Sequence, residues 1–390
     1  MPPNPPAQIT VAYSRHFDGL IAIAHGEQWR WAHTALEQAG FTRRDDGSFH
    51  TPGDSVPVTM AKLLPIARRH RATLQVSSRP YLGDIAEQIA ARLPGRWTAQ
   101  VEIYSNPLWQ EDLLPYLWDR GELAQSVKDR RVPYAAKLDS DTGIELLLAE
   151  HGPDPEHGYL LGALVFEEFE DSYDNPHAPA TVTLPAEPVS AAQVINGTFL
   201  PAYHRALHHR RTDAVLAALD TLRAEYDTLR TMGGSGHFSD GMPLRSPTVV
   251  REATKSFAER VWLEFLPVLT HAPGVVANCT TTVAHRPADA DVVRRLHDAL
   301  TSCAPAMKAW QDRLRDLRLQ PHRALEPPGP MRTRLGRQVL PALGVWLADA
   351  DDFARIAHAA RPGNPPRPGA VTPVPAVRPA LPPPSPSAHR

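Results

Sequence analysis

The chain has 390 residues, a formal net charge of −2 and an apolar content of 42%. This length allows two or three domains with sizeable cores, and the balanced charge argues against nucleic-acid binding by bulk positive charge. No apolar run approaches the length of a membrane span, and two cysteines are too few for a disulfide-built fold. The sequence therefore predicts a cytoplasmic protein with no membrane contact.

Residues 8–58 are expected to form a small α+β unit. A weak strand over Gln8–Ala12 precedes a helix over Gly26–Ala39, and Gly40 is placed to end that helix. The dipeptide Asp46-Gly47 favours a tight turn between two strands, which predicts a hairpin around it.

Residues 59–188 alternate between helix and strand and predict a mixed α/β domain. The predicted helices are Met60–Arg71, Gly83–Leu93 and Glu111–Lys128. The predicted strands are Ala72–Ser77, Thr98–Tyr104, Val132–Leu138, Ile144–His151 and Tyr159–Phe169. Turn-forming segments separate the last three strands, which indicates an antiparallel meander.

Residues 189–360 turn helical and predict a bundle. Two further helices are expected over Thr248–Leu269 and Arg334–Ala357, and Pro305 is expected to kink its helix without ending it. Apolar side chains alternate at spacings of three and four in Val215, Leu219, Leu222, Tyr226 and Leu229, and in Val293, Leu296, Leu300, Cys303, Met307, Trp310, Leu314 and Leu317. Such seams are typical of bundle or coiled-coil packing, so internal packing and a homodimer both remain open.

Proline is the compositional outlier, with 41 residues, and eleven of them lie in residues 361–390 beside no acidic residue. Such a segment buries too little surface to offset its ordering entropy. We expect a disordered, partly polyproline II tail over 361–390 and a short disordered start over 1–7. The whole chain is thus predicted as α+β with a disordered end. The PxxP spacings of the tail suit either an inert spacer or a protein partner with an aromatic groove.

Deleting residues 362–390 should leave the thermal midpoint within about 2 °C of that of the full chain, because surface changes usually cost under roughly 0.5 kcal/mol. Thermal unfolding followed by circular dichroism checks this expectation. A larger drop would show that the tail packs on the folded body.

The chain has 36 arginines and only 5 lysines, and it contains the stretches RPYLGDIAEQIAARLPGRW and NPLWQEDLLPYLWD. In these features the chain resembles actinobacterial proteins encoded by GC-rich genomes. The resemblance bears on cell type only and implies no activity, cofactor or site residue.

The first candidate site is a segment rich in histidine and arginine. His204 and His208 lie four residues apart on a predicted helix, which is the spacing of a metal-ligand pair. A metalloprotease helix needs Glu directly after the first His, and Arg205 stands there instead. The alternatives are a solvated basic helix start and a phosphate contact through Arg205, Arg210 and Arg211.

Other segments carry residue types that could support chemistry. The glycine-rich loop Gly233–Gly241 lacks the Lys of a P-loop, and Asp139–Gly143 has its glycine one position too early for a calcium loop, so both are expected to be connections. Cys303 is expected to be a buried small apolar residue, whereas Cys279 lies in a more open context. The densest carboxylate group is Glu167, Glu168, Glu170 and Asp171.

Charge is unevenly distributed along the chain. Residues 139–188 hold twelve acids and no Lys or Arg, whereas residues 308–337 hold eight basic residues against three acids. Each run can be a solvated face, or the two can meet within one chain or across a dimer.

No enzymatic pattern stands out, so we expect a non-catalytic protein without cofactors that acts by protein–protein contacts through its helical half. One alternative is a metal-assisted hydrolase that uses His204 and His208. Another is a nucleic-acid-binding accessory protein that uses the basic segments 204–211 and 308–337, with an affinity that falls steeply with salt.

Overall fold

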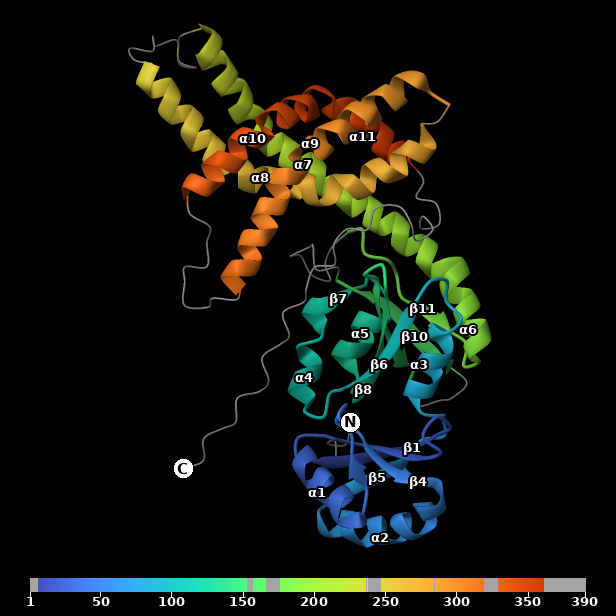
Figure 1. The fold of residues 1–390 in the computed structure, drawn as a ribbon. Helices are drawn as coiled ribbons and strands as arrows, with labels where there is room; N and C mark the ends of the chain where they lie inside the picture. Colours follow the sequence, from blue (N-terminus) through green and yellow to red (C-terminus); the bar gives the residue numbers. More distant parts are fainter. Residues whose placement is uncertain are drawn as a thin grey trace, which may run out of the picture. The chain divides into compact units, whose positions relative to one another are not determined.

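The computed structural model describes residues 6–152, 157–165, 176–235, 237, 247–283, 285–318 and 329–360. The chain divides into two compact units, of which the first reaches Tyr203 and the second begins at His204. Two sheets lie in the first unit and long helices make up the second, so the α+β fold class is confirmed (Figure 1). The predicted tail over 361–390 lies outside the described residues.

The first sheet has the strand order β3-β4-β2-β1-β5, in which only the β1–β5 pair is parallel. Helices α1 and α2 share one buried core with the strands, built around Ile9, Leu36, Phe49 and Leu63. The elements are β1 (Ala7–Ser14), β2 (Gly19–His25), α1 (Trp29–Ala39), β3 (Thr42–Arg43), β4 (Phe49–Pro52), α2 (Val56–Arg69) and β5 (Ala72–Val76).

The predicted strand, helix and hairpin of this region are all present, and Gly40 ends α1 in the left-handed conformation. The strand β2 was not predicted, because its side chains are buried on both faces and show no alternation. The sheet also takes in β5, which lies beyond the expected boundary at residue 58.

The second sheet has the order β11-β10-β9-β8-β6, with β7 paired to β10. The predicted meander is confirmed as β8, β9 and β10, and the predicted acidic loop Asp139–Gly143 is the β8–β9 hairpin turn. The elements are α3 (Leu82–Ala90), β6 (Trp97–Ile103), α4 (Pro107–Glu111), β7 (Leu117–Trp118), α5 (Glu122–Asp129), β8 (Tyr134–Ser140), β9 (Glu145–Glu150), β10 (Tyr159–Leu164), β11 (Val182–Leu184) and α6 (Pro188–Val194).

The single helix predicted over Glu111–Lys128 is wrong. A 3-10 turn over Leu114–Tyr116, the short strand β7 and the helix α5 take its place. Pro115 interrupts the helical pattern, and the buried Leu117 and Trp118 pair with β10 instead of forming a helix face.

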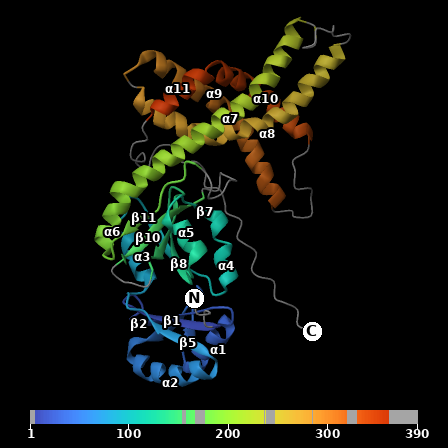
Figure 2. The same ribbon diagram turned by 180° about the vertical axis from the view of Figure 1, so that it is seen from behind.

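The second unit contains α7 (Leu200–Ser235) from His204 onward, α8 (Pro247–Thr282), α9 (Pro287–Arg318), α10 (Gly329–Ala348) and α11 (Ala350–Ala359); Figure 2 shows these helices from behind. Pro305 lies inside α9 without ending it, as predicted. The one helix predicted over Arg334–Ala357 is instead two helices. They meet at Asp349, whose carboxylate accepts two hydrogen bonds from Arg295 at 2.9 and 2.8 Å.

The predicted apolar seams lie inside this unit. Their described members are buried in, or packed against, one core that also includes Trp262, Phe265 and Trp346. The seams therefore pack helix against helix within one chain and give no reason for a second copy. A homodimer stays a prediction that needs another surface.

In the described part of the chain, no helix combines the length and the apolar content that a bilayer crossing requires.

One buried and one half-buried histidine predict that the first unit loses stability in acid. Burial, with Arg131 nearby, lowers the pKa of His25 to about 3. Burial, with Arg43 nearby, lowers the pKa of His33 to about 4. The unfolded chain takes up these protons below about pH 6.5 and the folded chain does not, so the free energy of unfolding falls as pH drops below that value.

For His25 the expected loss is about 2 kcal/mol between pH 7 and pH 5, from about 1.4 kcal/mol per pH unit below its unfolded pKa. Urea unfolding at the two pH values measures it. The variant His25→Gln does not titrate and can still bond Thr10, so its loss should be clearly smaller. Equal losses in both proteins would contradict this assignment.

Candidate functional site

His208 lies in α7 with both ring nitrogens engaged. Nε2 donates to the Ala357 carbonyl at 2.8 Å, and Nδ1 accepts from the Asn278 amide at 3.1 Å. This pair of bonds requires the neutral ring, and burial also lowers the pKa of His208. Within the described ranges no group of three or more His, Cys, Asp or Glu side chains is placed to hold a metal ion, so His204 and His208 have no third ligand there.

The three arginines of the same segment have different environments. Arg205 is exposed, Arg210 is only 4% exposed, and the Arg211 guanidinium lies against Gly274 of α8. The predicted solvated helix start is wrong, because α7 turns His208 and Arg210 into the unit. Of the proposed phosphate contacts, only Arg205 is exposed at the surface.

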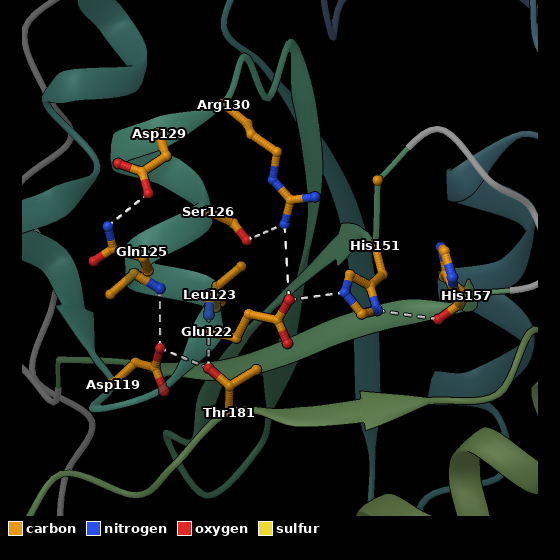
Figure 3. A network of polar contacts seen from close by, with 12 residues as sticks. Asp119, Glu122, Leu123, Gln125, Ser126, Asp129, Arg130, His151, His157 and Thr181 are labelled. Atoms are coloured by element: carbon orange, nitrogen blue, oxygen red, sulfur yellow. Dashed lines mark hydrogen bonds and ion pairs between the residues drawn. The ribbon is translucent and has the colours of Figure 1, made fainter.

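A polar network around α5 contains His151 and Glu122, a pair that resembles an acid–base dyad (Figure 3). His151 Nε2 lies 2.8 Å from Glu122 Oε1, and Arg130 lies 3.9 Å from the same carboxylate. Arg130 also donates to the Ser126 hydroxyl. The Glu122 carboxylate is thus shared between His151 and Arg130, and Arg130 is held in turn by Ser126.

The rest of this network caps α5. Asp119 accepts from the Ala124 amide at 3.0 Å and from the Thr181 hydroxyl at 2.6 Å, and Thr181 in turn accepts from the Leu123 amide at 2.9 Å (Figure 3). Free amides at a helix start need such acceptors. The network therefore has a structural role, which is to fix α5 against the chain before β11.

A buried arginine, Arg79, holds the β9–β10 turn in place. The Arg79 guanidinium, 6% exposed, donates to the carbonyls of Gly158, His151 and Gly152. Nearby, Tyr134 donates to Glu150 at 2.7 Å, and burial raises the pKa of Glu150. Arg79 thus ties the turn down, and Glu150 of the acidic run is engaged by Tyr134.

Other predicted candidates have plain outcomes. Cys303 is buried as expected, and Cys279 is buried as well, contrary to the open position predicted for it. Both thiols are free, and burial raises the pKa of Cys279 to about 12. Most of the loop Gly233–Gly241 and the carboxylates Glu167, Glu168, Glu170 and Asp171 lie outside the described residues.

Part of the basic run 308–337 lines a cleft at the surface. Lys308 and Arg315 pair with Asp312 at 2.8 and 3.0 Å, and Arg332 pairs with Glu259 at 3.1 Å. Further along α10, the exposed Arg334 and Arg337 have no ion pair or hydrogen bond with any described residue.

A cleft of about 640 Å³ lies between α8 and α10. Gly336 lets the two helices approach, because a Cβ there would overlap the Ala258 carbonyl oxygen. Lys255 and Glu259 are one turn apart on α8, and the Glu259 charge is already taken up by Arg332. The lining residues are Lys255, Glu259, Gly329, Pro330, Thr333, Arg334, Arg337 and Gln338.

The net effect is a cleft with excess positive charge. Lys255, Arg334 and Arg337 line it, and none of the three has a partner within the described part of the chain. The planar guanidinium of arginine matches carboxylates and phosphates in geometry, so this cleft suits an anionic ligand. We call this site the basic cleft.

Comparison with known proteins adds no further constraint: no family model, no curated protein and no solved structure matches this chain.

Proposed function

We propose that this protein is a non-catalytic binding protein whose basic cleft takes an acidic segment of a partner protein. The observation that carries the proposal is the grouping of Lys255, Arg334 and Arg337 around one cleft without ion partners among the described residues. Unpaired cations on one surface attract acidic partners and set their orientation. In this proposal the helical half is the contact surface.

An acidic peptide suits the cleft better than nucleic acid does. Among the described residues, no aromatic side chain lines the cleft, so bases would find no stacking surface on this part of it. In the other basic segment that was expected to contact phosphates, residues 204–211, Arg210 lies in the interior. A volume of about 640 Å³ lies in the size range of small-ligand sites and accommodates a short stretch of side chains.

The proposal includes a cytoplasmic location. Both cysteines are free and buried, which is the usual state of thiols in a reducing compartment.

The test compares the wild-type protein with the triple variant Lys255→Gln, Arg334→Gln, Arg337→Gln. A fluorescein-labelled oligoglutamate peptide is titrated with each protein and followed by anisotropy, and a short labelled DNA duplex is titrated in parallel. We expect the triple variant to bind oligoglutamate at least roughly tenfold more weakly, which corresponds to about 1.4 kcal/mol. Wild-type binding should also weaken with salt, because exposed charges are screened.

A matched control removes the same charge elsewhere on the unit. Lys308, Arg315 and Arg294 are cations of α9 that pair with Asp312 and Asp291, so their replacement by Gln should leave oligoglutamate binding near the wild-type value. Equal binding by the wild type and the cleft variant would overturn the proposal. If the wild type binds the duplex more tightly than oligoglutamate, and the cleft variant loses that duplex binding, the result would favour the nucleic-acid alternative instead.

A further inference from the structure

A second pocket, of about 280 Å³, lies in the first unit between α1 and α4. Its two aromatic walls are Trp29 and Trp109, whose ring centroids are 5.5 Å apart and whose planes are tilted by 51°. The remaining lining residues are Glu27, Gln28, Arg30 and Asn106. This feature is called the tryptophan pocket below.

The tryptophan pocket is held in shape by the core beneath it. The Trp29 and His33 rings pack edge to face with centroids 4.7 Å apart. The His33 ring packs in the same way on the fully buried Phe49, with centroids 4.9 Å apart. On the other side, the Gly26 amide donates to the Ser105 carbonyl at 2.9 Å, which ties the start of α1 to the segment before α4. A pocket fixed from both sides loses little entropy when it binds a ligand.

The surface of this pocket is both apolar and charged. Trp109 is 43% exposed and the neighbouring Leu108 is 62% exposed, which is a large apolar area to leave in water. Glu27 is exposed and has no partner among the described residues, whereas Arg30 lies over the Trp29 ring at 5.4 Å. Exposed indole rings that present a polar edge are frequent anchors of binding surfaces.

We propose that the tryptophan pocket binds the proline-rich tail of this protein, residues 361–390. The tail has eleven prolines, four arginines and no acid, so its composition suits an aromatic surface with a free carboxylate. Polyproline II segments dock on aromatic grooves because they are extended before binding and lose little entropy. The best match is Arg378-Pro379-Ala380-Leu381-Pro382, in which the PxxP prolines would contact the indoles and Arg378 would face Glu27.

Such a contact is compatible with the small effect expected for deletion of the tail. A site that is half occupied changes the equilibrium between folded and unfolded protein only about twofold. A twofold change in this equilibrium lies within the 2 °C limit that we expect for the deletion.

The test uses the full chain with one added cysteine, Ala376→Cys, labelled with bimane, a fluorophore that tryptophan quenches on contact. Cys279 and Cys303 are buried, so they should not react in the folded protein. The label should be quenched, and its brightness should rise by about twofold when Pro379→Ala and Pro382→Ala empty a half-occupied pocket. Glu27→Gln should raise the brightness in the same direction, by removing the partner of Arg378.

Two aromatic variants complete the design. Trp109→Phe removes the quencher at an exposed position and should brighten the label, whereas Trp97→Phe, outside the pocket, should not. Quenching that falls on dilution shows that the tail comes from a second copy, and quenching that does not fall shows the same chain; either result supports the proposal. A label that is equally bright in the wild type, in Trp109→Phe and in the double proline variant would overturn it.

Discussion

Replacing Gly336 with alanine should lower the free energy of unfolding of the helical unit by about 3 kcal/mol. A Cβ at this position would overlap the Ala258 carbonyl and crowd Val261, so α10 would have to move away from α8. The intrinsic preference of alanine for helices returns only about 1 kcal/mol. Urea unfolding monitored by circular dichroism measures the loss.

Gly197 gives the matched control. It lies in the helical segment Ile195–Phe199 of the first unit, where a Cβ would meet no atom within 4 Å. Gly197→Ala should therefore leave the stability unchanged or raise it slightly. The Gly336→Ala protein should also bind oligoglutamate more weakly, because the two helices that form the basic cleft would have moved. Equal stability of the two variants would show that α8 and α10 are not packed as closely as the structure has them.

The features that were predictable from the sequence are those carried by local periodicity. The described part of the α9 seam, from Val293 to Leu314, is buried in or packed against the core as its spacing predicts, and the Asp46-Gly47 turn joins β3 to β4. These signals depend on neighbours only a few residues away. They hold because the same side chains that define the period also form the core.

The errors arose where tertiary contacts override local pattern. Leu117 and Trp118 read as part of a helix face, yet β10 recruits them as a strand. The basic segment after His204 reads as solvated, yet the contacts of His208 with Ala357 and Asn278 draw it inward. Neither Ala357 nor Asn278 is adjacent to His208 in sequence, so no local signal announces either bond.

The candidate sites show the same limit. Lys255 lies on α8 and Arg334 on α10, and α9 separates these two helices in the sequence. Only the close approach at Gly336 brings α8 and α10 together around one cleft. The basic run that includes Arg334 and Arg337 was visible in the sequence. The pairs of Asp312 with Lys308 and Arg315 follow from helical spacing, whereas the pair of Arg332 with Glu259 was not visible because Glu259 lies on another helix.

Replacing Lys137 with methionine should destabilise the first unit by about 3 kcal/mol. Lys137 is 4% exposed in β8, and its ammonium lies 3.0 Å from Asp139 and 2.9 Å from Glu145. Asp139 and Glu145 are directly opposite each other on β8 and β9, where like charges repel. Methionine keeps the stem of the side chain but leaves these two carboxylates facing each other without the cation between them.

The repulsion can be separated from simple loss of packing. Adding Glu145→Gln to Lys137→Met removes one of the two charges and should restore at least half of the lost stability, because the remaining carboxylate then faces a neutral amide. Lys128→Met, at an exposed position of α5, is the control and should change the free energy of unfolding by less than about 0.5 kcal/mol. If the double variant is no more stable than Lys137→Met alone, the role of Lys137 is packing and not the neutralisation of this carboxylate pair.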